Sequence, residues 1–399
     1  MILKKQEGFP MTETTHPATG YYAQDDCSLE EFKALCAKSS DICDTPHASR
    51  IEKNVPIYEA AEIAPALGDA STRRALMAEW ARVLMSGAGI VVIKQAATDL
   101  AAIDAATAAY LQIIEAEKAA NGTKADHFAA AGANDRIWNA LQKLCLTAPE
   151  TFARSFANPS VDAICEAWLG PNYQMTAQVN LVHPGGQAQQ AHRDYHLGFQ
   201  SAEVSALYPA QTHELSPLMT LQGGIAHCDM SLESGPTKLL PFSQAYKPGY
   251  AAWRRPDFRA YFEQAHIQLP LNKGDALFFS PALFHAAGEN RTQTVQRFVN
   301  LLQISSPFGR AMESIDRAAM CKALYPVLAQ GILEGAALDA AIAATAEGYS
   351  FPTNLDTDPP IGGLAPETQA ALMRRCLAEG QTARDFDAAL DALEARKRP

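Results

Sequence analysis

The sequence predicts a mainly β core with flanking helices, arranged as an antiparallel sandwich or barrel. Between about residues 173 and 306, short runs rich in β-branched and aromatic residues alternate with turn residues such as Pro-Gly, Gly-Gly and Ser-Gly-Pro. No long helical pattern separates these runs, which argues against a doubly wound parallel sheet. Helical periodicity precedes and follows this region.

The segments before the β region are predicted from capping residues and apolar spacing. In order they are a short helix at Leu29–Cys36, a helix from the capping pair Ser71-Thr72 to Ser86-Gly87, a strand at 89–94, and a helix from Thr98 or Asp99 to about Ala120, ended by Asn121-Gly122.

Five strands are predicted in the β region, at 174–183, 218–227, 238–240, 276–279 and 297–304. Two amphipathic helices, at 367–378 and 382–397, are expected near the end of the chain. We therefore divide the sequence into an N-terminal arm (1–70), a core domain with leading helices (71–310), and a C-terminal helical extension packed on the same domain (311–399).

The composition is that of a soluble globular protein with a net charge of −11. An acidic chain lacks the global positive field that attracts nucleic acid or anionic lipid, so neither is an expected partner. The eight cysteines form no C-x-x-C pair, and reduced thiols suit a cytoplasmic location. We find neither a secretory leader nor a run of about 20 apolar residues. The expected partner is a small-molecule substrate, and the oligomeric state is left open.

The strongest chemical signal is His192-x-Asp194, followed far downstream by His285 at the end of an apolar run. Residues two apart in an extended segment point to one face, so His192 and Asp194 can reach the same ion. Two imidazoles and one carboxylate form the ligand set of non-haem iron(II) oxygenases, with coordination positions left open. The sequence therefore predicts a catalytic metal site at these three residues.

Arg297 begins the strand that follows His285. Its guanidinium could hold the far carboxylate of a bound dicarboxylic acid by two charge-assisted hydrogen bonds. Arg291 is the competing candidate, but it lies in a turn. Arg297 is therefore the preferred cofactor-binding residue.

Four segments, in order, resemble the phytanoyl-CoA dioxygenase family. HRDYHLGF (192–199) resembles its metal-binding segment, and SGPTKLLPFSQAYK (234–247) resembles a turn of that family. GDALFFSPALFHAAGENRT (274–292) resembles its distal-histidine segment, and GAGIVVIKQA (87–96) its first strand. The resemblance covers about residues 75–306.

This resemblance implies a double-stranded β-helix (jelly roll) with Fe(II), and with 2-oxoglutarate and O2 as co-substrates. The implied reaction hydroxylates an aliphatic C–H bond and releases succinate and CO2. His192, Asp194 and His285 match the family's metal triad, and Arg297 matches its 2-oxoglutarate arginine. Because related halogenases carry a small residue in place of the carboxylate, Asp194 favours hydroxylation.

The sequence departs from the family pattern at two places. Ala287 stands where a hydroxyl residue is expected, and Phe242-Ser243-Gln244 replaces the Gly-Ser-His end of the middle motif. Gln178 and Asn180, on the strand before the metal motif, are further cofactor-binding candidates, although their amides could equally face the substrate.

Several other polar and aromatic residues have a structural explanation that is at least as good as a functional one: His183, His196, His213, His227, Trp138, Tyr195 and Phe199. The alternative to an oxygenase is a cupin-like jelly-roll metal protein, either a binder or an isomerase. Arg297 has no evident purpose in that interpretation.

Overall fold

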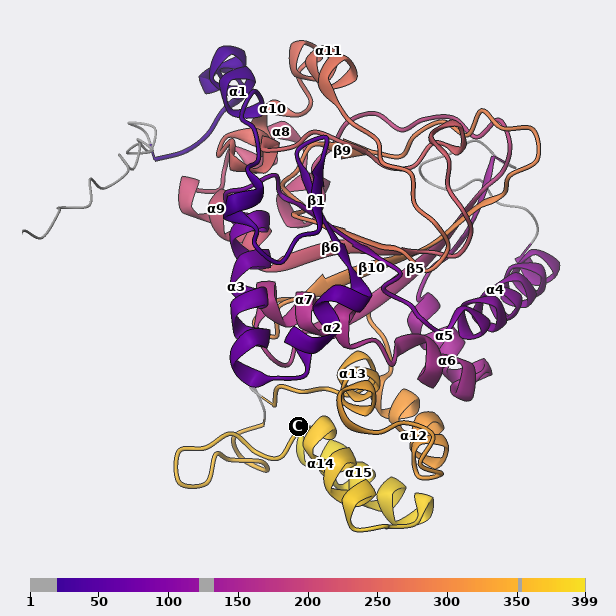
Figure 1. Ribbon diagram of the computed structural model, residues 1–399. Coiled ribbons are helices and arrows are strands. Elements are labelled where there is room, and N and C mark those ends of the chain that lie inside the picture. The colour runs from indigo at the N-terminus through magenta and orange to yellow at the C-terminus, as the bar shows by residue number, and fades with distance from the viewer. Residues whose placement is uncertain (1–19, 122–132, 351–353, 399) are drawn as a thin grey trace, which may run out of the picture.

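The computed structural model describes residues 20–121, 133–350 and 354–398. Its centre is an eight-stranded sheet with the order β1-β2-β3-β8-β6-β10-β5-β4 (Figure 1). Neighbouring strands are antiparallel, except that β2 and β3 are parallel. The strands of this sheet are β1 Arg50–Glu52, β2 Val55–Glu59, β3 Ile90–Lys94, β4 Asn134–Ile137, β5 Gln174–Val182, β6 Thr220–Ala226, β8 Ala276–Phe279 and β10 Arg297–Ser305.

A second, smaller β layer is formed by β7 (Lys238–Leu239) and β9 (His285–Ala286), which are antiparallel. Isolated bridges extend it, pairing His192 with His285, Leu239 with Ile267, and Met230 with Leu271. Figure 1 shows β9 well apart from β5, β6 and β10. The predicted β core with a jelly-roll arrangement and flanking helices is confirmed.

Helices flank the sheet, and α14 and α15 lie next to the C-terminal end of the chain (Figure 1). They are α1 Leu29–Cys36, α2 Ala60–Leu67, α3 Ala70–Met85, α4 Leu100–Asn121, α5 Ala140–Thr147, α6 Pro149–Phe156, α7 Pro159–Leu169, α8 Ala202–Ser205, α9 Ala210–Leu218, α10 Gly249–Ala252, α11 Pro256–Ala265, α12 Arg317–Leu328, α13 Gly335–Thr345, α14 Gln369–Ala378 and α15 Ala383–Arg396. Single 3-10 turns are η1 Gln24–Asp26, η2 Ile42–Asp44, η3 His196–Phe199, η4 Leu232–Ser234 and η5 Ser243–Ala245. None of the described helices is long and apolar enough to cross a membrane.

The alternation of side chains along the central strands separates a helix-covered face from a cavity face. On β10, Phe298, Leu302 and Ile304 belong to the main hydrophobic cluster, which also includes residues of the flanking helices. The residues between them, among them Leu301 and Gln303, line a cavity. Strand β5 shows the same alternation. The sheet thus presents Gln178, Asn180, Arg297 and Gln303 to the cavity.

The C-terminal helices join this same cluster. Helix α12 contacts α5 and α6, and α14 and α15 contact α12. The rings of Tyr325 on α12 and Phe386 on α15 stack with centroids 4.1 Å apart and planes 5° from parallel. The division of the chain at residues 70 and 310 nevertheless stays a prediction.

Most predicted elements match the structure within a few residues, including the helix at Leu29–Cys36. One predicted cap is wrong, because α3 is capped by Asp69. Its carboxylate accepts hydrogen bonds from the backbone N–H groups of Ser71 and Thr72, which therefore lie inside the helix. Asp99 caps α4 by accepting from the N–H of Ala102. Gly122, predicted to end α4, lies outside the described residues.

The segment predicted as an arm contributes two strands to the sheet. Strands β1 and β2 form a hairpin through Lys53 and Asn54, which have positive φ angles of 49° and 70°. Such angles are typical of a two-residue type I′ turn, for which Asn-Gly is the usual sequence signal. The Lys-Asn pair does not carry that signal. Residues 1–19 of the predicted arm lie outside the described residues.

Candidate metal centre and cavity

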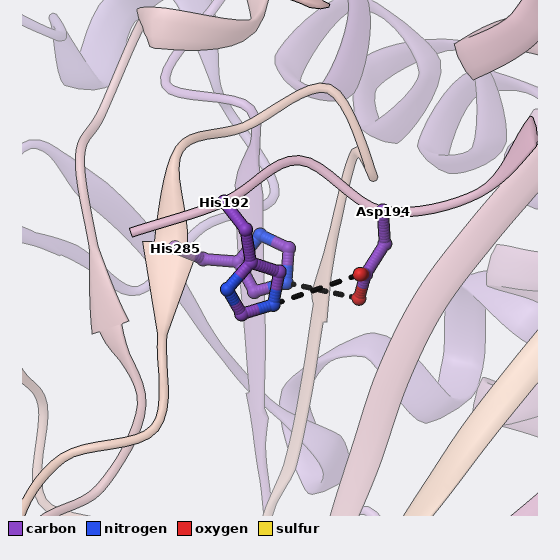
Figure 2. A group of neighbouring side chains, drawn as sticks. All are labelled: His192, Asp194 and His285. Carbon is purple, nitrogen blue, oxygen red and sulfur yellow. Dashed lines mark hydrogen bonds and ion pairs between the residues drawn. The ribbon is translucent and has the colours of Figure 1, made fainter. Parts of the chain in front are cut away.

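The structure brings His192, Asp194 and His285 together (Figure 2). One candidate ligand atom from each lies within 4.8 Å of the others. His192 and His285 exchange two backbone hydrogen bonds of 3.0 and 3.2 Å, which place their rings side by side at 4.4 Å between centroids. Asp194 follows in the same extended segment, so its carboxylate faces both rings.

Backbone carbonyls set the tautomer of both imidazoles. His192 Nδ1 lies 2.8 Å from the carbonyl oxygen of Gln190, and His285 Nδ1 lies 2.9 Å from that of Leu283. A carbonyl oxygen can only accept, so each Nδ1 carries the proton. The two Nε2 lone pairs are left for a metal ion, and this arrangement is typical of histidine ligands.

The protonation states of the site also favour metal binding. Burial lowers the pKa of His192, so its ring stays neutral near pH 7. Burial would raise the pKa of Asp194, but His192, His285 and a hydrogen bond from Gln222 together hold it below its usual range. A carboxylate and neutral imidazoles are the forms that bind divalent ions. The donor set therefore fits the iron(II) expected from the sequence.

Gln222, on β6, is a site residue that the sequence analysis missed. Its Nε2 donates a 2.5 Å hydrogen bond to Asp194 Oδ2, the same oxygen that His285 Nε2 approaches at 3.3 Å. Its own Oε1 is buried without a hydrogen-bond partner among the described residues. In the sequence, Gln222 is a polar residue in a mostly apolar predicted strand, and this signal alone does not indicate a site residue.

Arg297 lies in the same cavity as the triad, whereas Arg291 is exposed at the surface. Arg297 is buried, and its Nη1 donates to the carbonyls of Ser234 and Gly288, both at 3.0 Å. Burial lowers its pKa to about 10, so it stays charged at neutral pH. Apolar side chains also line the cavity, among them Met230, Leu269, Leu271, Leu277 and Phe279.

Gln178 and Asn180 also line the cavity, on β5. Gln178 Oε1 accepts a 3.1 Å hydrogen bond from Arg136 Nη1, and Asn180 Oδ1 accepts one of 3.1 Å from Asn134 Nδ2. Both donors come from the edge strand β4. Strand β4 was not among the predicted strands, so Arg136 was not among the predicted site residues.

The backbone near Ala287 is held by another glutamine. Gln189 lines the cavity, and its Oε1 accepts a 3.3 Å hydrogen bond from the N–H of Ala287. The Nε2 of Gln189 consequently remains as a donor beside the position where the family pattern expects a hydroxyl group.

The other candidate residues have varied surroundings. Trp138 and Phe199 line the cavity mouth, and the Tyr195 hydroxyl donates to Gln303 Oε1 at 2.6 Å. Four further histidines considered in the sequence make contacts outside the triad: His196 with Ser216, His183 with Asp135, His213 with Ser205, and His227 with Thr107. None of these four lines the cavity described here. Ser243, in the divergent middle motif, accepts a hydrogen bond from the N–H of Phe284 and so helps to place the strand that carries His285.

A family profile described as "Phytanoyl-CoA dioxygenase (PhyH)" matches residues 85–298, more than half of the chain. Among curated proteins, Dioxygenase trt7 of Aspergillus terreus is 27% identical over 147 residues, which are 37% of this chain and 46% of that protein. Dioxygenase andF of Emericella variicolor is 24% identical over 147 residues, 35% of this chain and 45% of that protein. The chain thus spans less than half the length of the curated relatives it matches.

Solved structures to which the chain is similar include the non-heme alpha ketoglutarate dependent epimerase SnoN from nogalamycin biosynthesis. It is 19% identical with a TM-score of 0.41, over 60% of this chain and 82% of that one. The carbocyclase SnoK from the same biosynthesis is 18% identical with a TM-score of 0.39, over 55% and 80%. AviO1 from Streptomyces viridochromogenes Tue57 is 15% identical with a TM-score of 0.41, over 60% and 97%.

Proposed function

The chain belongs to the phytanoyl-CoA dioxygenase family, and from that premise we propose that it is an Fe(II)- and 2-oxoglutarate-dependent dioxygenase that hydroxylates a small-molecule metabolite. One oxygen atom of O2 enters an aliphatic C–H bond and the other enters succinate, while the 1-carboxylate of 2-oxoglutarate leaves as CO2. The observation that carries the proposal is that the triad and the buried Arg297 line one cavity.

His192, Asp194 and His285 would hold the iron. When bound, the metal supplies the activation of oxygen that couples loss of CO2 to oxidation of the substrate. Gln222 holds the Asp194 carboxylate in place, and the two backbone carbonyls hold the rings of the histidines. These contacts fix the ligands before any metal arrives.

Arg297 would bind the far carboxylate of 2-oxoglutarate with the donors that its two backbone contacts leave over. Gln189 Nε2 would supply the hydrogen bond that Ala287 cannot make, and Asn180 lies on the strand beside Arg297. The apolar side chains that line the cavity would limit access of water to the bound co-substrate, which would strengthen the charged contact.

Succinate formation tests this proposal. Protein purified without oxygen is given Fe(II), ascorbate and 2-oxoglutarate, and succinate is measured with and without O2. We expect slow oxygen-dependent release, which is lost in His192→Ala and strongly reduced in Arg297→Ala. Arg291→Ala, which removes an exposed arginine of the same loop region, serves as the matched control and should behave as wild type. Failure of the protein both to bind 2-oxoglutarate and to form succinate would favour a metal-binding jelly roll without oxygenase activity.

A further inference from the structure

Two glutamines present their amide nitrogens to the cavity. Gln178 and Gln303 both line it, and both are at most 7% exposed. The Oε1 of Gln178 accepts from Arg136 Nη1. A guanidinium can only donate, so this contact fixes which end of the Gln178 amide faces Arg136. The Nε2 of Gln178 is the end that is left for a ligand.

Gln303 is held in the same way from the other side. The Tyr195 hydroxyl, which is buried, donates to its Oε1 at 2.6 Å. Among residues 20–121, 133–350 and 354–398, neither the Nε2 of Gln178 nor that of Gln303 has an acceptor. Gln178 pairs with Leu301 across the β5–β10 ladder, so Gln303 is its diagonal neighbour at about 7–8 Å. The two N–H2 groups can therefore contact one ligand group.

The register places this pair of amides away from the co-substrate end. Gln303 pairs directly with Gln222, the residue that holds Asp194. Arg297 lies six residues back along β10, so its Cα atom is roughly 20 Å from that of Gln303. A five-carbon diacid running from the triad toward Arg297 extends away from Gln303. Asn180 pairs with Val299 and so lies nearer Arg297 than Gln178 does.

Resting on the proposed function, we propose that Gln178 and Gln303 form the substrate subsite, and that the substrate carries an oxygen acceptor, a carboxylate or carbonyl group, which receives both N–H2 groups. Arg136 and Tyr195 are positioning residues, because each fixes the orientation of one amide. A wall of donors also disfavours a cationic group at this position, since an ammonium has no acceptor and would leave both buried donors unpaired.

The test compares three probes with the same carbon skeleton: hexanoate, hexanamide and hexylammonium. Mn(II) and 2-oxoglutarate are bound to the full chain, and broadening of the probe's proton resonances by Mn(II) reports binding near the triad. We expect wild type to bind hexanoate and hexanamide and to discriminate against hexylammonium. Gln303→Glu exchanges a donor for a negative charge, so hexanoate affinity should fall about tenfold or more while hexylammonium gains.

Gln330→Glu makes the same chemical change at an exposed position after α12 and is the matched control. Gln178→Leu, which removes the donor without adding charge, should weaken both oxygen-bearing probes. The inference is wrong if wild type binds no oxygen-bearing probe, if it binds hexylammonium equally well, or if Gln303→Glu leaves the preference unchanged. Binding of 2-oxoglutarate, measured separately as a rise in melting temperature with Mn(II), shows whether a failure belongs to the proposed function instead.

Discussion

Gln222 Nε2 donates to Asp194 Oδ2 from the centre of the main sheet, at 2.5 Å. The contact joins the extended metal-binding segment to a rigid strand, because β6 is paired on both sides, with β8 and β10. It also leaves Gln222 Oε1 buried and unpaired among the described residues. The residue therefore contributes to the site at some cost to stability.

Gln222→Leu should weaken metal binding without unfolding the protein. Loss of a residue that orients a metal ligand typically lowers affinity about 10–100-fold. Removal of the unpaired Oε1 offsets part of the loss of the hydrogen bond to Asp194, so the free energy of unfolding of the metal-free variant should change little. Titration calorimetry with Mn(II) and denaturant unfolding measure the two effects. Unchanged Mn(II) affinity would show that the hydrogen bond does not orient Asp194.

Metal binding should stabilise the native state through the triad. At a free Mn(II) concentration of 100 times the dissociation constant, the free energy of unfolding should increase by about 2.7 kcal/mol. His192→Ala should lose this gain, while His183→Ala, which changes a histidine outside the triad, should keep it. Thermal unfolding with and without Mn(II) distinguishes the two variants. An equal rise in both would place the ion elsewhere.

Gln189 should contribute to 2-oxoglutarate binding. Gln189→Ala removes one hydrogen bond and is expected to raise the dissociation constant about fivefold, for a loss of ~1 kcal/mol. Ala287→Ser in that background restores a hydroxyl at the family position and should recover part of the affinity. Gln187→Ala, at an exposed position of the same loop, is the control. The assignment fails if Gln189→Ala binds 2-oxoglutarate as wild type does.

His227 should make the fold sensitive to mild acid. Burial lowers its pKa to about 4 from the ordinary value of 6.5. Between these two pH values the unfolded chain binds a proton that the folded chain does not. The contribution of the neutral His227 ring to the free energy of unfolding is therefore fully present above pH 6.5. It decreases by roughly 3 kcal/mol as the pH falls to 4.

His227→Gln removes this titration and keeps a hydrogen-bonding group near Thr107, which His227 Nδ1 contacts at 2.8 Å. Urea unfolding at pH 7, 6 and 5 should show a shallower decline of the free energy of unfolding for the variant. Parallel declines for both proteins would mean that other groups dominate.

The stacked pair Tyr325 and Phe386 tests whether the C-terminal helices fold with the core. Phe386→Ala should lower the free energy of unfolding by about 3–5 kcal/mol, because the ring is fully buried. If the helices and the sheet form one cooperative unit, a single transition should shift to lower temperature, and Mn(II) binding should disappear in that transition. Two separate transitions would instead indicate an independent C-terminal unit.

Local patterns were sufficient to propose His192, Asp194 and His285 as ligands, because residues two apart in an extended segment share a face. The strand β9 that carries His285, and its pairing with His192, were not predicted. They could not predict Gln222 or Arg136. Each of these acts through a contact set by strand order, and strand order depends on packing across the whole chain. The Ser71-Thr72 cap was wrong for a local reason, since Asp69 offers a competing carboxylate two residues earlier.

The backbone pairing between His192 and His285 also bears on how iron is gained and lost. The two residues close a loop of more than 90 residues, and their reciprocal hydrogen bonds close it without any ion. The conformational entropy of that loop is therefore lost on folding, and metal binding does not have to compensate for it. The backbone pairing of the site forms without a metal ion. A zinc finger differs in this respect, because its chain folds only around its metal. Iron can then exchange between solution and an already folded protein, at a rate set by access to the cavity.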